Sequence, residues 1–88
     1  MSSLLRVEPA DVLVESLKPA DDGHGIIIRL FGASGQSRSA ALKWTGLKPK
    51  AVFLSDTSEQ EGEKVTGPVA VPGYGLVTLR ASLDQAHR

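Results

Sequence analysis

The chain has 88 residues, with ten Lys or Arg, ten Asp or Glu, and no cysteine. This length limits it to one small domain, and the lack of cysteine excludes disulfides and every cysteine-based metal site. A formal net charge of zero gives no overall field that would attract nucleic acid or an anionic membrane.

Turn-forming residues interrupt the chain at short intervals, and the apolar residues between them alternate or form short β-branched runs, which is typical of an all-β domain. In chain order, strands are predicted at 11–17, 25–33, 36–44, 50–55, 69–71 and 74–81. Residues 1–9 are expected to be an extension or a first edge strand, and 82–88 a flexible tail. Residues 10–81 are predicted to form a small antiparallel β-sandwich of about six to seven strands, with an open barrel as the alternative.

The segment 25–33 is predicted to be the central strand, because its isoleucines suit a pleated surface. Alternation places its residues on two faces, with Ile26, Ile28 and Leu30 on one and Ile27, Arg29 and Phe31 on the other. Both faces must then be partly covered. A Ser-Gly turn at 34–35 predicts a hairpin with 36–44, and the acidic stretch 56–67 is predicted to be an exposed loop.

Apolar runs are too short to cross a bilayer, which takes about 20 residues, and the first residues lack the apolar run of a signal peptide. We therefore expect a cytoplasmic chain with no membrane partner. The sequence also gives no support for catalysis by a pair of carboxyl groups, because none of the acids is flanked by the apolar residues that raise a carboxyl pKa. Asp21, Asp22 and His24 form a conceivable cation site, but their spacing favours an exposed turn.

Three residues are candidates for binding sugar or contacting another domain. Trp44 and Tyr74 have rings that could stack on a sugar, although Trp44 shares a face with Ala40 and Leu42, which favours a core or interdomain position. Arg29 lies in the most apolar strand and needs a partner if buried. The expected partners are Asp56, Glu59 or Glu15, and the alternative is a ligand or a neighbouring catalytic domain.

Basic residues gather between positions 29 and 50, where no acid occurs: Arg29, Arg38, Lys43, Lys48 and Lys50. Basic residues near aromatic ones are typical of proteins that bind single-stranded nucleic acid. Alternation nevertheless places Lys43 on a solvent face, and the net charge is zero, so no nucleic-acid partner is predicted.

One long segment, 12–35, has a distinctive order of features. A strand ends in an apolar residue and Lys-Pro, an acidic turn with Gly follows, and an arginine interrupts the next apolar strand before an aromatic residue. The residues that carry this order are Leu17, Lys18, Pro19, Asp22, Gly23, Ile28, Arg29, Leu30, Phe31 and Gly35.

Two later segments follow in the same order. In 53–59 a strand ends in Asp56 with Glu59 three residues on, and 72–80 has an aromatic residue before a closing Thr-Leu-Arg strand that contains Thr78. Together the three segments resemble the C-terminal β-sandwich region of family 38 glycoside hydrolases, the zinc-dependent α-mannosidases, over about residues 10–81.

In that family, zinc ligands, nucleophile and acid/base carboxylate lie in a large N-terminal catalytic domain, to which nothing in this chain corresponds. The resemblance therefore implies an accessory domain without catalytic residues, metal or cofactor of its own. Its implied partner is an α-mannosidase-like catalytic domain or subunit. This role implies that an apolar surface is exposed in the isolated domain, with Trp44, Phe53 or Leu76 on it, which allows a homo-oligomer. The alternative is an autonomous carbohydrate-binding module, whose partner is an oligosaccharide.

Overall fold

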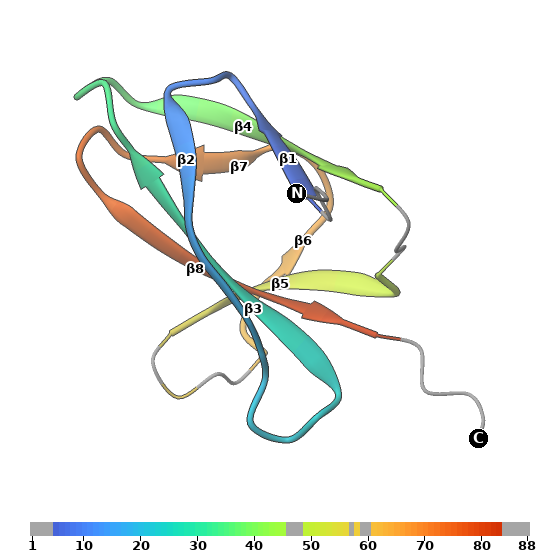
Figure 1. Cartoon of the computed structure of the whole chain (residues 1–88). Helices are drawn as coiled ribbons and strands as arrows, with labels where there is room; N and C mark the ends of the chain where they lie inside the picture. Colours follow the sequence, from blue (N-terminus) through green and yellow to red (C-terminus); the bar gives the residue numbers. More distant parts are fainter. Residues whose placement is uncertain (1–4, 46–48, 57, 59–60, 84–88) are drawn as a thin grey trace.

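The structure is a computed structural model that describes residues 5–45, 49–56, 58 and 61–83. Two antiparallel sheets face each other, as predicted for a β-sandwich (Figure 1). The small sheet has the order β1 (Leu5–Glu8), β4 (Arg38–Trp44), β7 (Val69–Val71). The large sheet has the order β2 (Val12–Pro19), β3 (Gly25–Gly32), β8 (Leu76–Ser82), β5 (Ala51–Ser55), β6 (Lys64–Val65). No helix capable of spanning a membrane occurs in these residues.

The core lies between the sheets and is built from alternate residues of the long strands. Its buried members are Val12, Ile28, Leu30, Leu79 and Ala81 from the large sheet and Ala40, Val69 and Val71 from the small one. Because strand side chains alternate, the intervening residues of β3 and β8, which include Arg29 and Arg80, point away from the core. Ile27 is one of these, yet only 1% of it is exposed, so both faces of the central strand are covered, as predicted.

Two strands, β1 and β6, lie where the sequence either left two alternatives or predicted a loop. β1 is the edge strand that was the alternative to an extension at 1–9. β6 lies within the predicted loop 56–67, where Val52 pairs with Val65 and Phe53 with Lys64. A two-residue strand has no periodicity to read, so the sequence pattern could not show it.

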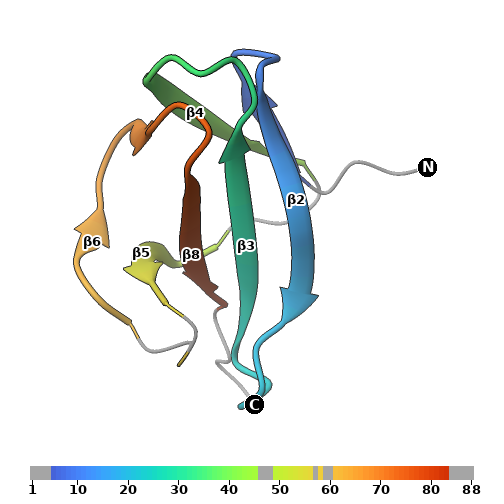
Figure 2. The same ribbon diagram turned by 90° about the vertical axis from the view of Figure 1, so that its left-hand side faces the viewer.

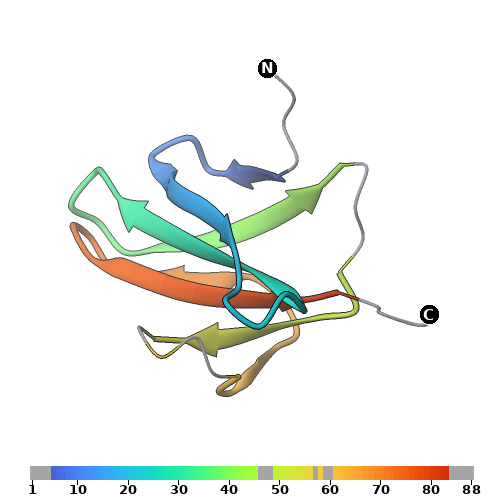
Figure 3. The same cartoon turned by 60° about the horizontal axis from the view of Figure 1, so that its bottom comes forward.

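The predicted hairpin between 25–33 and 36–44 is wrong. β3 pairs with β2 and β8, whereas β4 pairs with β1 and β7, so residues 33–37 cross from one sheet to the other (Figure 3). The end of β3 is held by other connections: Ala33 N–H donates to the carbonyl of Asp11 at 2.8 Å, and Tyr74 N–H donates to that of Gly32 at 2.7 Å.

Candidate interaction surface

The outer face is the face of the large sheet that points away from the small sheet. Figure 2 looks onto it, with β4 behind. Leu13, Phe31 and Leu76 lie opposite one another on β2, β3 and β8. Leu13 is 48% and Leu76 56% exposed, and Phe31 is partly exposed. These three residues form an apolar row that remains in contact with solvent, which marks a candidate site for contact with another protein.

The second row of the outer face contains Arg29. Its cross-strand neighbours are Ser16 on β2 and Thr78 on β8. Arg29 is half-buried, and within the described part of the chain no ion pair joins it to a carboxylate. The expected pairing with Asp56 or Glu15 is therefore wrong, and Glu59 lies outside the described residues.

The buried arginine of this face is Arg80 in the third row, which is 7% exposed. Its Nη2 lies 2.8 Å from Oδ2 of Asp22, and its Nε lies 3.7 Å from Oε2 of Glu61. The Ser82 hydroxyl also donates to Glu61 Oε2, at 2.6 Å. A Cβ at Gly25 would lie 2.7 Å from the backbone oxygen of Ala81, so glycine is required where β3 closely approaches β8 next to Arg80. Arg80 thus ties two loops to the sheet.

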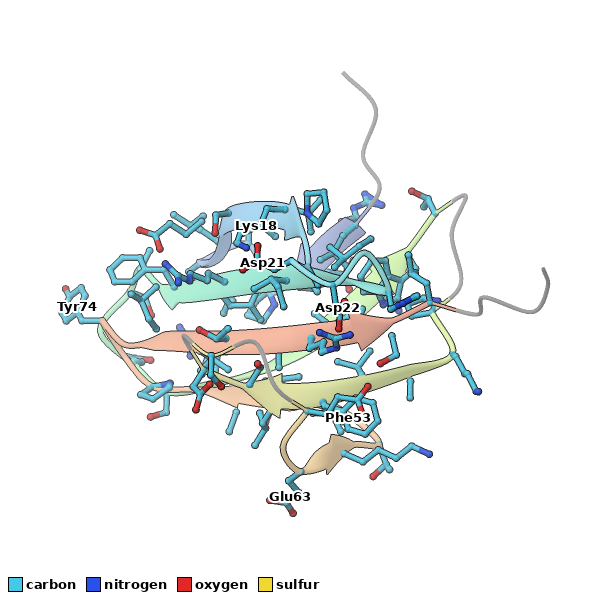
Figure 4. All side chains as sticks on the ribbon, turned by 90° about the horizontal axis from the view of Figure 1, so that it is seen from below. Lys18, Asp21, Asp22, Phe53, Glu63 and Tyr74 are labelled. Carbon is cyan, nitrogen blue, oxygen red and sulfur yellow. The ribbon has the colours of Figure 1, made fainter. Side chains whose placement is uncertain are left out.

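Asp22 belongs to the predicted turn between β2 and β3. Its Oδ1 accepts a hydrogen bond from the backbone N–H of His24 at 2.9 Å, and Gly23 takes the left-handed φ of 78°. The backbone N–H of His24, followed by the Arg80 side chain, lowers the pKa of Asp22 below its ordinary value. Figure 4 shows Asp22 over β8. One carboxylate oxygen of Asp22 therefore holds the turn, and the other forms the ion pair with Arg80.

Tyr74 lies at one end of the sandwich, in the turn between β7 and β8 (Figure 4). It is 70% exposed and has a φ of 56°, which is uncommon for a bulky residue. The Gly75 N–H closes the turn on the carbonyl of Pro72 at 3.0 Å. The ring packs beside Gly35, where a Cβ would come within 2.7 Å of it. The backbone therefore fixes an aromatic ring that projects into solvent.

Trp44 lies on the core-facing side of β4, as its alternation with Ala40 and Leu42 predicts. It is half-buried and borders an open groove of about 360 Å³ between the two sheets. The residues that line the groove are Ala41, Leu42, Trp44, Val52, Val65, Gly67 and Pro68. Trp44 and Tyr74 therefore belong to different parts of the surface, and the fold does not bring them together with Arg29 in one site.

The other motif residues have local roles. Lys18 lies 3.8 Å from Asp21 at the end of β2, next to Pro19. The Ser58 hydroxyl and the Ser58 N–H donate to Asp56 Oδ1 at 2.5 and 2.8 Å, and they lower the pKa of Asp56. These contacts lie at turns and strand ends.

The basic residues between 29 and 50 separate onto different elements. Arg38 donates from Nε to Asp11 Oδ2 at 2.8 Å, and this contact is the main cause that lowers the pKa of Asp11. Lys43 is exposed on β4 in the small sheet, whereas Arg29 belongs to the large one. Lys48 lies outside the described residues. The pairs Asp11–Arg38 and Asp22–Arg80 join positions far apart in the chain, so the local sequence pattern could not predict them.

These features define an all-β domain of the sandwich class, with an apolar row on one face and charged pairs that tie loops to strands. No group of three or more His, Asp or Glu suited to a metal ion occurs among the residues that the structure describes. The chain belongs to the family described as glycosyl hydrolases family 38 C-terminal beta sandwich domain, whose model matches residues 11–83. This match confirms the resemblance seen in the sequence. Searches of curated proteins and of solved structures gave no match.

Proposed function

We propose that this chain is a non-catalytic accessory domain that packs against the catalytic domain of an α-mannosidase-like enzyme and thereby supports carbohydrate hydrolysis. The observation that carries the proposal is the family match over residues 11–83, because the family is described as the C-terminal domain of a glycosyl hydrolase. A domain of this kind needs a contact surface for the remainder of the enzyme, and it needs no reacting groups of its own.

The outer face supports this role. Leu13, Phe31 and Leu76 form an apolar row across three neighbouring strands, and large side chains that stay exposed together are a common mark of a protein contact. Arg29 lies one row away and is half-buried. An apolar contact bordered by a cation matches the usual anatomy of interfaces, in which apolar residues form the centre and polar ones the rim.

The proposal can be tested by isothermal titration calorimetry, which measures whether this chain associates with a separately produced family 38 catalytic domain. Leu13→Ser combined with Leu76→Ser is expected to weaken association at least tenfold when measured at a temperature at which the variant stays folded, because both side chains are about half exposed and each loss costs only about 1 kcal/mol of stability. Leu17→Ser is the matched control, since Leu17 is 40% exposed on the same strand but points to the opposite face. No association by the unaltered chain would refute the proposal.

The second candidate function is an autonomous carbohydrate-binding module, and the observation that favours it is Tyr74, with 70% of its surface exposed. An aromatic ring fixed in solvent can stack on the apolar face of a sugar. Titration with a methyl mannoside should then shift the NMR signals of the Tyr74 ring, and Tyr74→Gly, which suits the positive φ, should keep the fold and abolish binding. Unchanged ring signals at millimolar mannoside would exclude this function.

A further inference from the structure

β4 is paired unequally along its two edges. On one edge, β1 pairs with Ala41 to Trp44 of β4. On the other edge, β7 pairs only with Arg38 to Ala40. The stretch 41–44 therefore has no strand partner on the β7 side within the described ranges. Antiparallel strands present backbone N–H and C=O groups to both edges in alternation, so this stretch offers hydrogen-bonding groups to a further strand.

The residues that precede β7 explain why it does not extend alongside residues 41–44 of β4. Pro68 precedes β7 and has no N–H to donate. Before it, Gly67 follows the strand β6 of the large sheet by two residues. The connection 66–68 therefore leaves the edge of β4 and crosses to the other sheet, which can be followed in Figure 1 from β7 to β6. This crossing leaves room beside the second half of β4.

The room beside this edge is the open groove of about 360 Å³. Leu42 and Trp44 form its wall on β4, and Val52 and Val65 form its wall on the large sheet. All four side chains also pack against the core. A strand placed along β4 would direct every second side chain into this groove, where apolar side chains would complete the contact between the sheets.

We propose that the edge of β4 at 41–44 accepts, by strand addition, an extended segment of a partner polypeptide with apolar side chains at alternate positions. Two observations identify such a segment: the backbone groups of the edge match those of an extended chain, and the groove walls are apolar. The inference rests on the proposed function, in which the partner is a catalytic domain, and it names how that domain contacts this chain.

A synthetic peptide tests the site directly. The probe has seven residues, alternating valine and threonine between terminal lysines, with both ends capped. Trp44 is the only tryptophan of the chain, so its fluorescence reports on the groove. The peptide is expected to shift the emission to shorter wavelength in a saturable way and to slow amide hydrogen exchange at 41–44 at least tenfold. The control is the same peptide with alternate backbone nitrogens methylated, which cannot pair as a strand.

A groove variant provides the second test. A Cβ built at Gly67 meets no atom within 4 Å, so Gly67→Leu is expected to fold and to place a bulky side chain at the groove. It should weaken peptide binding at least tenfold, whereas Gly67→Ala should bind as the unaltered chain does. Equal binding of the plain and methylated peptides, or no response of Trp44 and of exchange at 41–44, would overturn the proposal.

These experiments use the isolated chain and the peptide alone, so their result is separate from that of the association assay. Association that persists without peptide binding would refute strand addition and leave the proposed function standing. Peptide binding without association would refute the catalytic domain as partner and leave the site on β4 standing.

Discussion

Replacing Ile27 with alanine tests whether the outer face holds a second buried region. Ile27 is 1% exposed although it points away from the main core. Its cross-strand neighbours are Lys18 and Arg80, whose long aliphatic stems can cover an apolar side chain while the charged ends stay polar or paired. The ion pairs of Arg80 with Asp22 and Glu61 hold one of these stems in place.

The expected cost follows from the burial of Ile27. The substitution removes three carbons from a site shielded from solvent, which costs about 2.4 kcal/mol at about 0.8 kcal/mol for each CH₂. A cavity that collapses only in part raises the total to about 3 kcal/mol. In a domain of this size, about 3 kcal/mol corresponds to a fall of about 12 to 24 °C in melting temperature.

Leu76→Ala is the matched control, because Leu76 lies on the same face and loses the same three carbons, but 56% of it is exposed. Its expected cost is about 1 kcal/mol. Urea unfolding followed by circular dichroism measures both variants against the unaltered chain, and the midpoints give the difference when the slopes agree. If Ile27→Ala costs no more than Leu76→Ala, the outer face is an ordinary solvated sheet surface and holds no second buried region.

Three further predictions concern turns and charges. Gly73→Ala should lower stability by about 1 to 3 kcal/mol in thermal unfolding, since its Cβ would lie 2.1 Å from the Gly35 backbone; equal melting temperatures of Gly73→Ala and Gly67→Ala would contradict this. Asp22→Asn should flatten the acid side of the stability–pH curve: its lowered pKa stabilises the fold above the ordinary value of 3.8, and that stabilisation is lost as pH falls through the folded pKa. An unchanged acid limb would refute this. Arg80→Lys should lower the melting temperature, because lysine lacks the planar fork that reaches two carboxylates; retention of full stability would argue against the network.

Which side chains of each strand face the core could be predicted from the sequence, but which strands pair with each other could not. Period-two alternation follows from strand geometry alone, and Ile28 and Leu30 are buried in the core as that period indicates. Which strand lies beside β3 depends on hydrogen bonds made by distant segments, such as the one from Ala33 to Asp11. A Ser-Gly turn fits both a hairpin and a crossing between sheets, so the alternation could not exclude the wrong pairing.

The sequence pattern singled out Arg29 as the arginine that needs a partner if buried, whereas the buried, paired arginine is Arg80. Arg29 and Arg80 both alternate with apolar residues, so the local pattern treats them alike. What distinguishes Arg80 is tertiary: the carboxylate of Asp22, from the β2–β3 turn, lies 2.8 Å from its Nη2. Trp44 was easier to place, because its core-facing position follows from its own strand.

The connections at the Tyr74 end also bear on how the domain tolerates changes of length. Residues 33–37 and 72–75 touch where Gly73 lies against Gly35, and the connection at 9–11 is tied to the first of them through the hydrogen bond between Ala33 and Asp11. Surface loops usually accept insertions. Here one added residue in any of the three connections would displace a partner, so linkers, tags and new termini are expected to be poorly accepted at this end.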